Sequence, residues 1–198
     1  MKKIAEIIKT TLILFLITSI SALLLAFVNE KTAPIIAKNE VEKQTQALRT
    51  IMSDAADFKE ISISDEMEKL AYDKNCEVNG VYEALSNNGE VIGICSIITG
   101  SGYESGLNIA VGVNKEMQVS DIQIISSSET PGLGRNASKA EFKKQYKGKS
   151  GGLSVVKSGA KDNEINAISG ATLTSNGVTE IVNLAVEIAK VNGGEANE

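Results

Sequence analysis

The hydrophobic positions along the chain form an apolar helical segment, an amphipathic helical segment and a region of alternating periodicity. Residues 10–29 contain no charged residue and are dense in Leu, Ile, Phe and Ala. At about 1.5 Å per residue, a helix of this length crosses the hydrocarbon core of a membrane. Residues 30–52 continue with partly amphipathic helical spacing, with Pro34 early in the segment. Residues 53–75 are mixed and acidic, which indicates a short helix and a connection.

The period of the apolar positions then changes to two, which predicts β-strands. The expected strands are 78–85, 91–99, 107–113 and 119–126, followed by two short strands flanking a turn, 153–157 and 165–168. The sequence Asn87-Asn88-Gly89 predicts a hairpin turn between the first two strands. A short helix is expected at 138–146.

The last element is the strongest helix prediction. Apolar residues from Val178 to Ala189 share one helical face, and Gly193-Gly194 is expected to end the helix. The sum predicts an α+β fold, in which one N-terminal transmembrane helix precedes a domain with a mainly antiparallel sheet and flanking helices.

These patterns divide the chain into five parts. We expect a short cytoplasmic tail, a transmembrane helix, a helical stalk with a connection, a folded domain and a frayed terminus, at residues 1–9, 10–29, 30–75, 76–192 and 193–198. Lys2, Lys3 and Lys9 precede the apolar segment, and the positive-inside rule places this tail in the cytoplasm. A cleaved signal peptide is the alternative, but the apolar run is long for one, and no clear Ala-x-Ala site follows before Glu30.

Composition argues against several classes of function. The 198 residues include no His, which removes His-based catalysis and the commonest metal ligand. Cys76 and Cys95 are far apart, so no metal site is expected from this chain alone, and whether the two cysteines pair stays open. No residue is assigned a catalytic role. The formal net charge is -5, and no basic stretch is interleaved with aromatic residues, which argues against nucleic-acid binding.

Residues 166–177 are rich in small and hydroxyl side chains and stand just before the final helical pattern. Backbone N–H groups at a helix start are free to bind an anion, and the segment offers small residues and hydroxyls for a phosphate, at Ser169, Gly170, Ala171, Thr172, Thr174 and Ser175. The same residue types are also preferred in an ordinary turn and helix N-cap, so the residues alone leave both interpretations open.

A second motif, Glu129-Thr130-Pro131-Gly132-Leu133-Gly134, follows a strand pattern. Pro131 presets φ and Gly132 supplies a positive φ, which together predict a type II turn. On the residues alone, a tight loop is the simpler interpretation.

Both motifs resemble signatures of the FMN-binding domain family of RnfG and NqrC, which are subunits of redox-driven ion pumps. Ser-Gly-Ala-Thr followed by Leu-Thr-Ser resembles the family's flavinylation motif, and Glu129–Gly134 resembles a signature that precedes it. Looser similarities occur at 29–37 and in the glycine loop 102–106, so the resemblance runs along nearly the whole chain. The compact length is closer to RnfG. Asn166 departs from the usual Asp of the attachment motif, and Ser127 departs from a His found in many members.

The resemblance implies one FMN per chain, bound to Thr172 through a phosphoester bond. It implies that the phosphate end of the cofactor is lined by Ser169, Gly170, Ala171 and Thr174, with Leu173 also in contact, and that the ribityl or isoalloxazine side meets Glu129, Thr130 and Leu133. A separate flavin transferase that uses FAD would attach the cofactor. The 76–192 segment is then the FMN-binding domain.

The function implied is that of an electron relay in an Rnf-type membrane complex, which couples electron transfer between ferredoxin and NAD to translocation of Na+ or H+. The chain would be one component of a translocase in the inner cell membrane, inactive alone, with its FMN domain on the extracytoplasmic side and with membrane and iron–sulfur subunits as partners. Two alternatives stay open: an NqrC-like component of a Na+-translocating NADH:quinone reductase, and a non-redox, membrane-anchored binding module.

Overall fold

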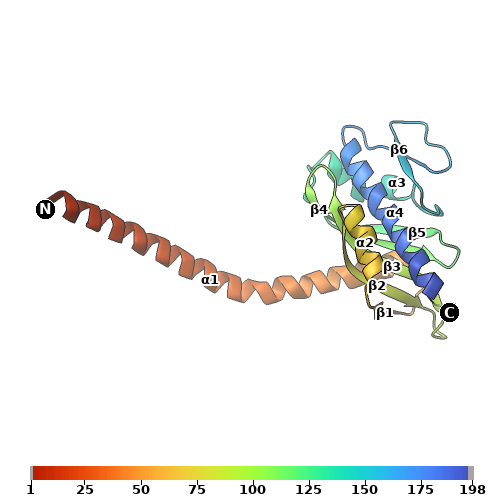
Figure 1. The fold of residues 1–198 in the computed structure, drawn as a ribbon, viewed down its shortest axis with the longest axis horizontal. Coiled ribbons are helices and arrows are strands. Elements are labelled where there is room, and N and C mark those ends of the chain that lie inside the picture. Colours follow the sequence, from red (N-terminus) through yellow and green to blue (C-terminus); the bar gives the residue numbers. More distant parts are fainter. Residues whose placement is uncertain (1, 196–198) are drawn as a thin grey trace. The chain divides into compact units, whose positions relative to one another are not determined.

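The computed structural model describes residues 2–195, which Figure 1 shows as a ribbon. The chain divides into two compact units, Met1–Glu42 and Lys43–Glu198. Helix α1 (Lys2–Ile51) runs without interruption through the boundary between the units. The apolar and the amphipathic helical segments of the sequence are therefore parts of one helix.

The first unit is the membrane-compatible part of α1. Among the described residues, α1 is the helix that is long and apolar enough to cross a membrane, with a mean hydropathy of 2.6 in its most apolar window. Thr10 and Thr18 donate their hydroxyls to carbonyls four residues earlier, so these polar groups are satisfied within the helix itself. Pro34 lies inside α1, where it removes one backbone donor from the helix ladder.

The second unit is built on a five-stranded antiparallel sheet in the order β1-β2-β3-β4-β5. The strands are β1 (Asp57–Ile61), β2 (Glu77–Leu85), β3 (Val91–Ser101), β4 (Ser105–Asn114) and β5 (Val119–Ser126). Successive strands in the sequence are neighbours in the sheet. The Asn-Asn-Gly turn joins β2 to β3, and Gly89 takes the positive φ that the turn requires.

The remaining elements pack around this sheet. Helices α2 (Asp65–Asp73) and α4 (Thr172–Glu195) lie against one another beside the sheet (Figure 1). Between β5 and α4 the chain forms the 3-10 helix η1 (Gly134–Ser138), helix α3 (Ala140–Lys143), and the short strands β6 (Ser154–Val156) and β7 (Glu164–Asn166). The predicted α+β class is thus confirmed.

The sheet is buried on both faces. On β3, Ile94 and Ile98 pack into the core formed with α4, whereas Cys95 and Ile97 between them pack into a second core. The second core is closed by the last turns of α1 and the residue that follows the helix, through the buried side chains of Ala47, Leu48, Ile51 and Met52. Because both faces are covered, β3 reads in the sequence as a nearly continuous apolar run.

Gly112 on β4 allows the end of α1 to approach the sheet closely. A Cβ at this position would lie 3.0 Å from the carbonyl oxygen of Ile51, tighter than ordinary van der Waals contact. The C-terminal end of α1 is therefore an integral layer of the second unit.

Three local expectations differ from the structure. The segment 53–75 contains strand β1 in addition to a helix, and the sequence pattern missed this strand because its charged residues lie at an exposed edge of the sheet. The two short strands expected near the end of the sheet region are present as β6 and β7, and they pair in parallel, a direction that the sequence pattern did not specify.

The predicted helix 138–146 is instead η1 followed by the four-residue α3. The final helix also differs at both ends. Helix α4 begins at Thr172, inside the small-residue motif, and continues through Gly193 and Gly194 to Glu195. Gly193 packs near the Met117 side chain, where a Cβ would be 3.0 Å from the terminal methyl group, so tertiary contact overrides the helix-ending tendency of glycine.

The two cysteines are both free thiols on opposite faces of the sheet. Burial raises the pKa of the Cys95 thiol to about 12. The pKa of half-buried Cys76 is also raised, first by burial and then by the negative charge of Glu180, with Lys74 acting in the opposite direction.

We predict that a maleimide at pH 8 labels Cys76 slowly and leaves Cys95 unlabelled until the protein unfolds, because only the thiolate reacts and Cys95 is inaccessible. Peptide mapping of the labelled full-length chain measures this. Equal labelling of both thiols in the native protein, or a disulfide between them, would contradict the prediction.

We also predict that Ile51→Ala lowers the free energy of unfolding by about 2–5 kcal/mol, because it opens a cavity between α1 and the sheet. Urea denaturation of the full-length chain in detergent, followed by circular dichroism, measures the change. The matched control is Ile36→Ala on the exposed part of α1, for which we expect a change within about 0.5 kcal/mol. Equal effects of the two substitutions would mean that the end of α1 does not stabilise the domain.

Candidate functional site

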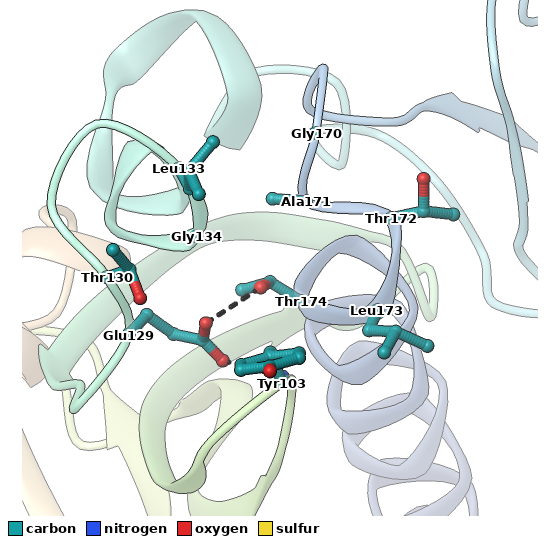
Figure 2. Close-up of a pocket in the computed structure, with 10 residues that line it drawn as sticks. All are labelled: Tyr103, Glu129, Thr130, Leu133, Gly134, Gly170, Ala171, Thr172, Leu173 and Thr174. Atoms are coloured by element: carbon teal, nitrogen blue, oxygen red, sulfur yellow. Dashed lines mark hydrogen bonds between the residues drawn. The ribbon is translucent and has the colours of Figure 1, made fainter.

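A pocket of about 550 Å³ lies at the first turn of α4 (Figure 2). Three separate segments of the chain form it: the loop after β3, the Pro-Gly loop after β5, and the turn that leads into α4. The lining residues are Tyr103, Glu129, Thr130, Leu133, Gly134, Gly170, Ala171, Thr172, Leu173 and Thr174.

A tight turn sets the direction in which α4 starts. The Ala171 N–H donates to the Ile168 carbonyl at 2.9 Å, and Gly170 within this turn has φ +75°, which glycine adopts without strain. The Ser175 hydroxyl then joins the turn to the helix, because it accepts from the Ile168 N–H at 2.9 Å and donates to the Ala171 carbonyl at 3.0 Å.

A close approach between α4 and the sheet holds the same helix end. Gly177 lies in the second turn of α4, where a Cβ would overlap the carbonyl oxygen of Ser101 at the end of β3. A larger residue at Gly177 would push the helix away from the loop after β3, so this glycine keeps the pocket walls together.

The structure separates the four hydroxyls of the motif into two classes. Thr174 and Ser175 are buried and hydrogen-bonded within the protein. Ser169 and Thr172 are exposed, and within residues 2–195 neither hydroxyl has a hydrogen-bond partner. Of these two, Thr172 lines the pocket and Ser169 does not. Thr172 is therefore the available hydroxyl of the motif at this pocket.

The first turn of α4 also presents free backbone donors. The first intrahelical bond runs from Ser175 N–H to the Ala171 carbonyl at 3.0 Å, and in the described chain the N–H groups of residues 172–174 have no acceptor. The first turn carries no acidic side chain that could occupy them. Such a helix start has a partial positive charge and binds anions, phosphate groups above all.

The Glu129 carboxylate connects the three segments of the pocket. Its Oε1 accepts from the Tyr103 N–H at 2.8 Å and the Glu104 N–H at 3.2 Å, and its Oε2 accepts from the Thr174 hydroxyl at 2.9 Å (Figure 2). Glu129 is 2% exposed and Thr174 is 1% exposed. One buried side chain thus joins the loop after β3, the Pro-Gly loop and α4.

Two glycines make room for this carboxylate. A Cβ at Gly102 or at Gly134 would overlap an oxygen of the Glu129 side chain. Gly102 of the glycine loop and the final glycine of the Pro-Gly motif are therefore explained by the packing of one carboxylate.

The outer part of the pocket is apolar. Tyr103, Leu133 and Leu173 line it although they are 70%, 45% and 58% exposed. Among the described residues of the second unit, only Tyr72 is a further large apolar or aromatic side chain with such exposure. Exposed apolar side chains gathered at one pocket are typical of a ligand-binding site.

Comparisons with known proteins fit this geometry. Residues 102–187 match the FMN-binding domain family, and residues 1–51 match the RnfG N-terminal region. The chain is 39% identical over 190 residues to the G subunit of the Na+-translocating ferredoxin:NAD+ oxidoreductase complex of Acetobacterium woodii, covering 91% of this chain and 90% of that protein. The chain belongs to the RnfG family.

A second relative and a solved structure extend the comparison. The G subunit of the proton-translocating ferredoxin:NAD+ oxidoreductase complex of Clostridium ljungdahlii is 33% identical, with 89% of this chain and 88% of that protein covered. A crystal structure of the C subunit of Na+-translocating NADH-quinone reductase from Parabacteroides distasonis has a TM-score of 0.52 at 23% identity, covering 76% of this chain and 90% of that one. The solved structure shows a shared fold.

The pocket of this RnfG-family chain fits FMN by three of its own features. Its volume lies within the roughly 300–1,000 Å³ typical of small-molecule sites. Free N–H groups of residues 172–174 suit a phosphate, and the apolar side chains at the opening suit a flat aromatic ring.

Most of the residues expected from the sequence lie together at this pocket. Thr172, Gly170, Ala171, Leu173 and Thr174 line it from the α4 side, and Glu129, Thr130 and Leu133 line it from the Pro-Gly loop. Ser169 lies in the turn outside the lining. The contacts with the cofactor that were assigned to these residues stay predictions.

Tyr103 and Gly134 line the pocket but are not among the site residues expected from the sequence. Tyr103 lies in the glycine loop and Gly134 ends the Pro-Gly motif, and both stretches resemble the family. This resemblance was the signal in the sequence that could have identified them as site residues. Asn166 lies away from the lining, where its side-chain oxygen accepts from the Ala160 N–H at 3.0 Å and fixes the loop after β6.

We predict that Gly134→Ala destabilises the protein by about 1–3 kcal/mol, because the added methyl group displaces the buried Glu129 carboxylate. Urea denaturation of the full-length chain measures the loss. Thr130→Ala in the same loop is the control, because the Thr130 side chain is exposed, and its change should stay within about 0.5 kcal/mol. A Gly134→Ala protein as stable as the control would show that the carboxylate is not held in this packing.

Proposed function

We propose that this chain is the electron-relay component of an Rnf-type membrane complex and carries FMN through a phosphoester bond to Thr172. The observation that carries the proposal is the position of the Thr172 hydroxyl. It is exposed, it lines the pocket, and it stands at a helix start whose N–H groups are free within the described chain. When bound, FMN supplies reversible one- and two-electron chemistry.

Different pocket residues would bind different parts of the cofactor. The N–H groups of residues 172–174 would bind the phosphate oxygens, and Gly170 lets the backbone approach them. Leu133, Leu173 and Tyr103 would contact the ring and exclude water from part of its surface. Thr130 would contact the ribityl or isoalloxazine side, as the family resemblance implies.

Attachment by a separate enzyme is consistent with the acid–base groups of this pocket. The single carboxylate among the lining residues, Glu129, already accepts three hydrogen bonds and contacts Thr174 rather than Thr172. The chain therefore presents a hydroxyl without an adjacent base. A flavin transferase that uses FAD would form the bond from Thr172 Oγ to phosphorus, with loss of the hydroxyl proton and with AMP as the leaving group.

The relatives and the first unit support the proposed partners and orientation. The two relatives above are subunits of complexes named for Na+ and for protons, and the apolar segment 10–29 contains no ionisable residue. We infer that the ion path lies in other membrane subunits of the complex. The positive charges of Lys2, Lys3 and Lys9 support an orientation with the N-terminus in the cytoplasm and the FMN domain outside.

We predict that the full-length chain isolated from its native host carries the added mass of FMN less one water, located at Thr172 by fragmentation. Thr172→Val should remove the adduct completely and change the free energy of unfolding by less than about 0.5 kcal/mol, because the Thr172 side chain is exposed and makes no hydrogen bond in the described chain. Intact-mass spectrometry and urea denaturation measure the two effects.

Ser169→Ala is the matched control, since it removes the other exposed hydroxyl of the motif and should leave the adduct in place. An unmodified native chain would favour the binding-module alternative, in which the pocket holds an unmodified anion. An adduct that persists in Thr172→Val would overturn the assignment of the attachment residue.

A further inference from the structure

The wall of the pocket contains a negative charge that no cation neutralises within the described chain. Glu129 is the one lining residue with a side chain charged at neutral pH, and none of the ion pairs among the described residues includes it. Its partners are two backbone N–H groups and one hydroxyl. These three donors stabilise a carboxylate, but they leave its net charge in place.

Burial makes this charge effective over the width of the pocket. At 2% exposure, the charge of Glu129 is screened by water and salt far less than the charge of a surface carboxylate is. The charge also has a fixed position, because both oxygens are hydrogen-bonded and because Gly102 and Gly134 close around them.

The negative charge of Glu129 is opposite in sign to the partial positive charge at the nearby start of α4. The free N–H groups of residues 172–174 give one side of the pocket a partial positive charge, which suits a phosphate. The carboxylate of Glu129 adds a full negative charge to the wall beside Thr174. The pocket therefore presents free backbone donors and a fixed carboxylate next to one another.

We propose that Glu129 lowers the reduction potential of the flavin held in this pocket, in addition to positioning the three segments that form it. The proposal rests on the proposed function, because it needs a flavin on Thr172. Reduction adds negative charge to the ring wherever proton uptake does not match electron uptake. A fixed carboxylate in the wall raises the free energy of that reduced form, so the flavin passes its electrons on more readily.

The decisive variant is Glu129→Gln, which keeps the size and the acceptor oxygen for the two N–H groups and removes the charge. We expect reduction of the flavin to become at least tenfold more favourable, an upward shift of about 30 mV for a two-electron couple or about 59 mV for a one-electron couple. The measurement is a spectroscopic redox titration at pH 8 of the full-length chain, co-expressed with a flavin transferase and purified in detergent.

Two controls separate charge from structure. Glu104→Gln removes a carboxylate from an exposed position in the neighbouring loop, and its potential should stay close to that of the wild type. Glu129→Asp keeps the charge but shortens the side chain, so it should lose stability while its potential stays closer to wild type than that of Glu129→Gln. Equal shifts in Glu129→Asp and Glu129→Gln would show a structural effect and overturn the proposal, as would an unchanged potential in Glu129→Gln.

If Glu129→Gln does not fold, Thr174→Val decides the question. This substitution keeps the charge and removes one of the three donors whose dipoles partly offset its field, so the potential should fall below that of the wild type; an unchanged potential would overturn the proposal. Failure of the proposed function is recognised separately, because the mass of the wild-type chain is measured first. A wild-type chain without flavin refutes the proposed function, whereas flavin-bearing chains with equal potentials refute the role of Glu129.

Discussion

The functional end of this protein depends on one buried carboxylate and the three donors around it. Glu129 joins the loop after β3 to the Pro-Gly loop and to the first turn of α4, which are distant in the sequence. Burying a carboxylate is costly unless its oxygens are hydrogen-bonded, so the arrangement is stable only when all three segments are in place. The pocket is consequently formed as a unit. Gly102, Gly134 and Thr174 are all required by the same group, the Glu129 carboxylate.

The sheet supplies the rigid support for this pocket. The core on the α4 side of the sheet fixes the long helix whose first turn presents Thr172. A hydrogen bond of 2.9 Å between the Tyr146 and Thr179 hydroxyls anchors the segment between β5 and α4 to the same helix. Asn183 adds two hydrogen bonds to the backbone of Leu153. The site is thus placed on regular elements, while the loops that complete it are held by side-chain contacts.

Much of this architecture follows from the sequence because it depends on periodicity. The strands β2 to β5 were predicted nearly at their observed bounds, since alternating or continuous apolar runs distinguish buried strands. Strand β1 was missed because an edge strand with charged residues lacks that signal. The parallel pairing of β6 with β7 was also missed, because a three-residue strand does not reveal its direction of pairing.

The site shows the same division between local pattern and tertiary context. Small residues and hydroxyls near a helix start were visible in the sequence, but Ser169, Thr172, Thr174 and Ser175 look equivalent there. Only the fold shows which hydroxyls are consumed by internal hydrogen bonds and which remain available. The burial of Glu129 was equally hidden, because most glutamates are exposed and its partners come from segments distant in the sequence.

The last turns of α1 have two roles that cannot be separated. The helix that contains the membrane-compatible segment ends as a layer of the second core, through Leu48 and Ile51, and Met52 just after the helix belongs to the same core. A protease that cut the chain just after Met52 would therefore release a domain with one apolar face of its sheet uncovered. Such a domain would aggregate rather than remain soluble. A water-soluble version of the FMN-binding domain has to begin no later than Lys43, at the boundary between the two units.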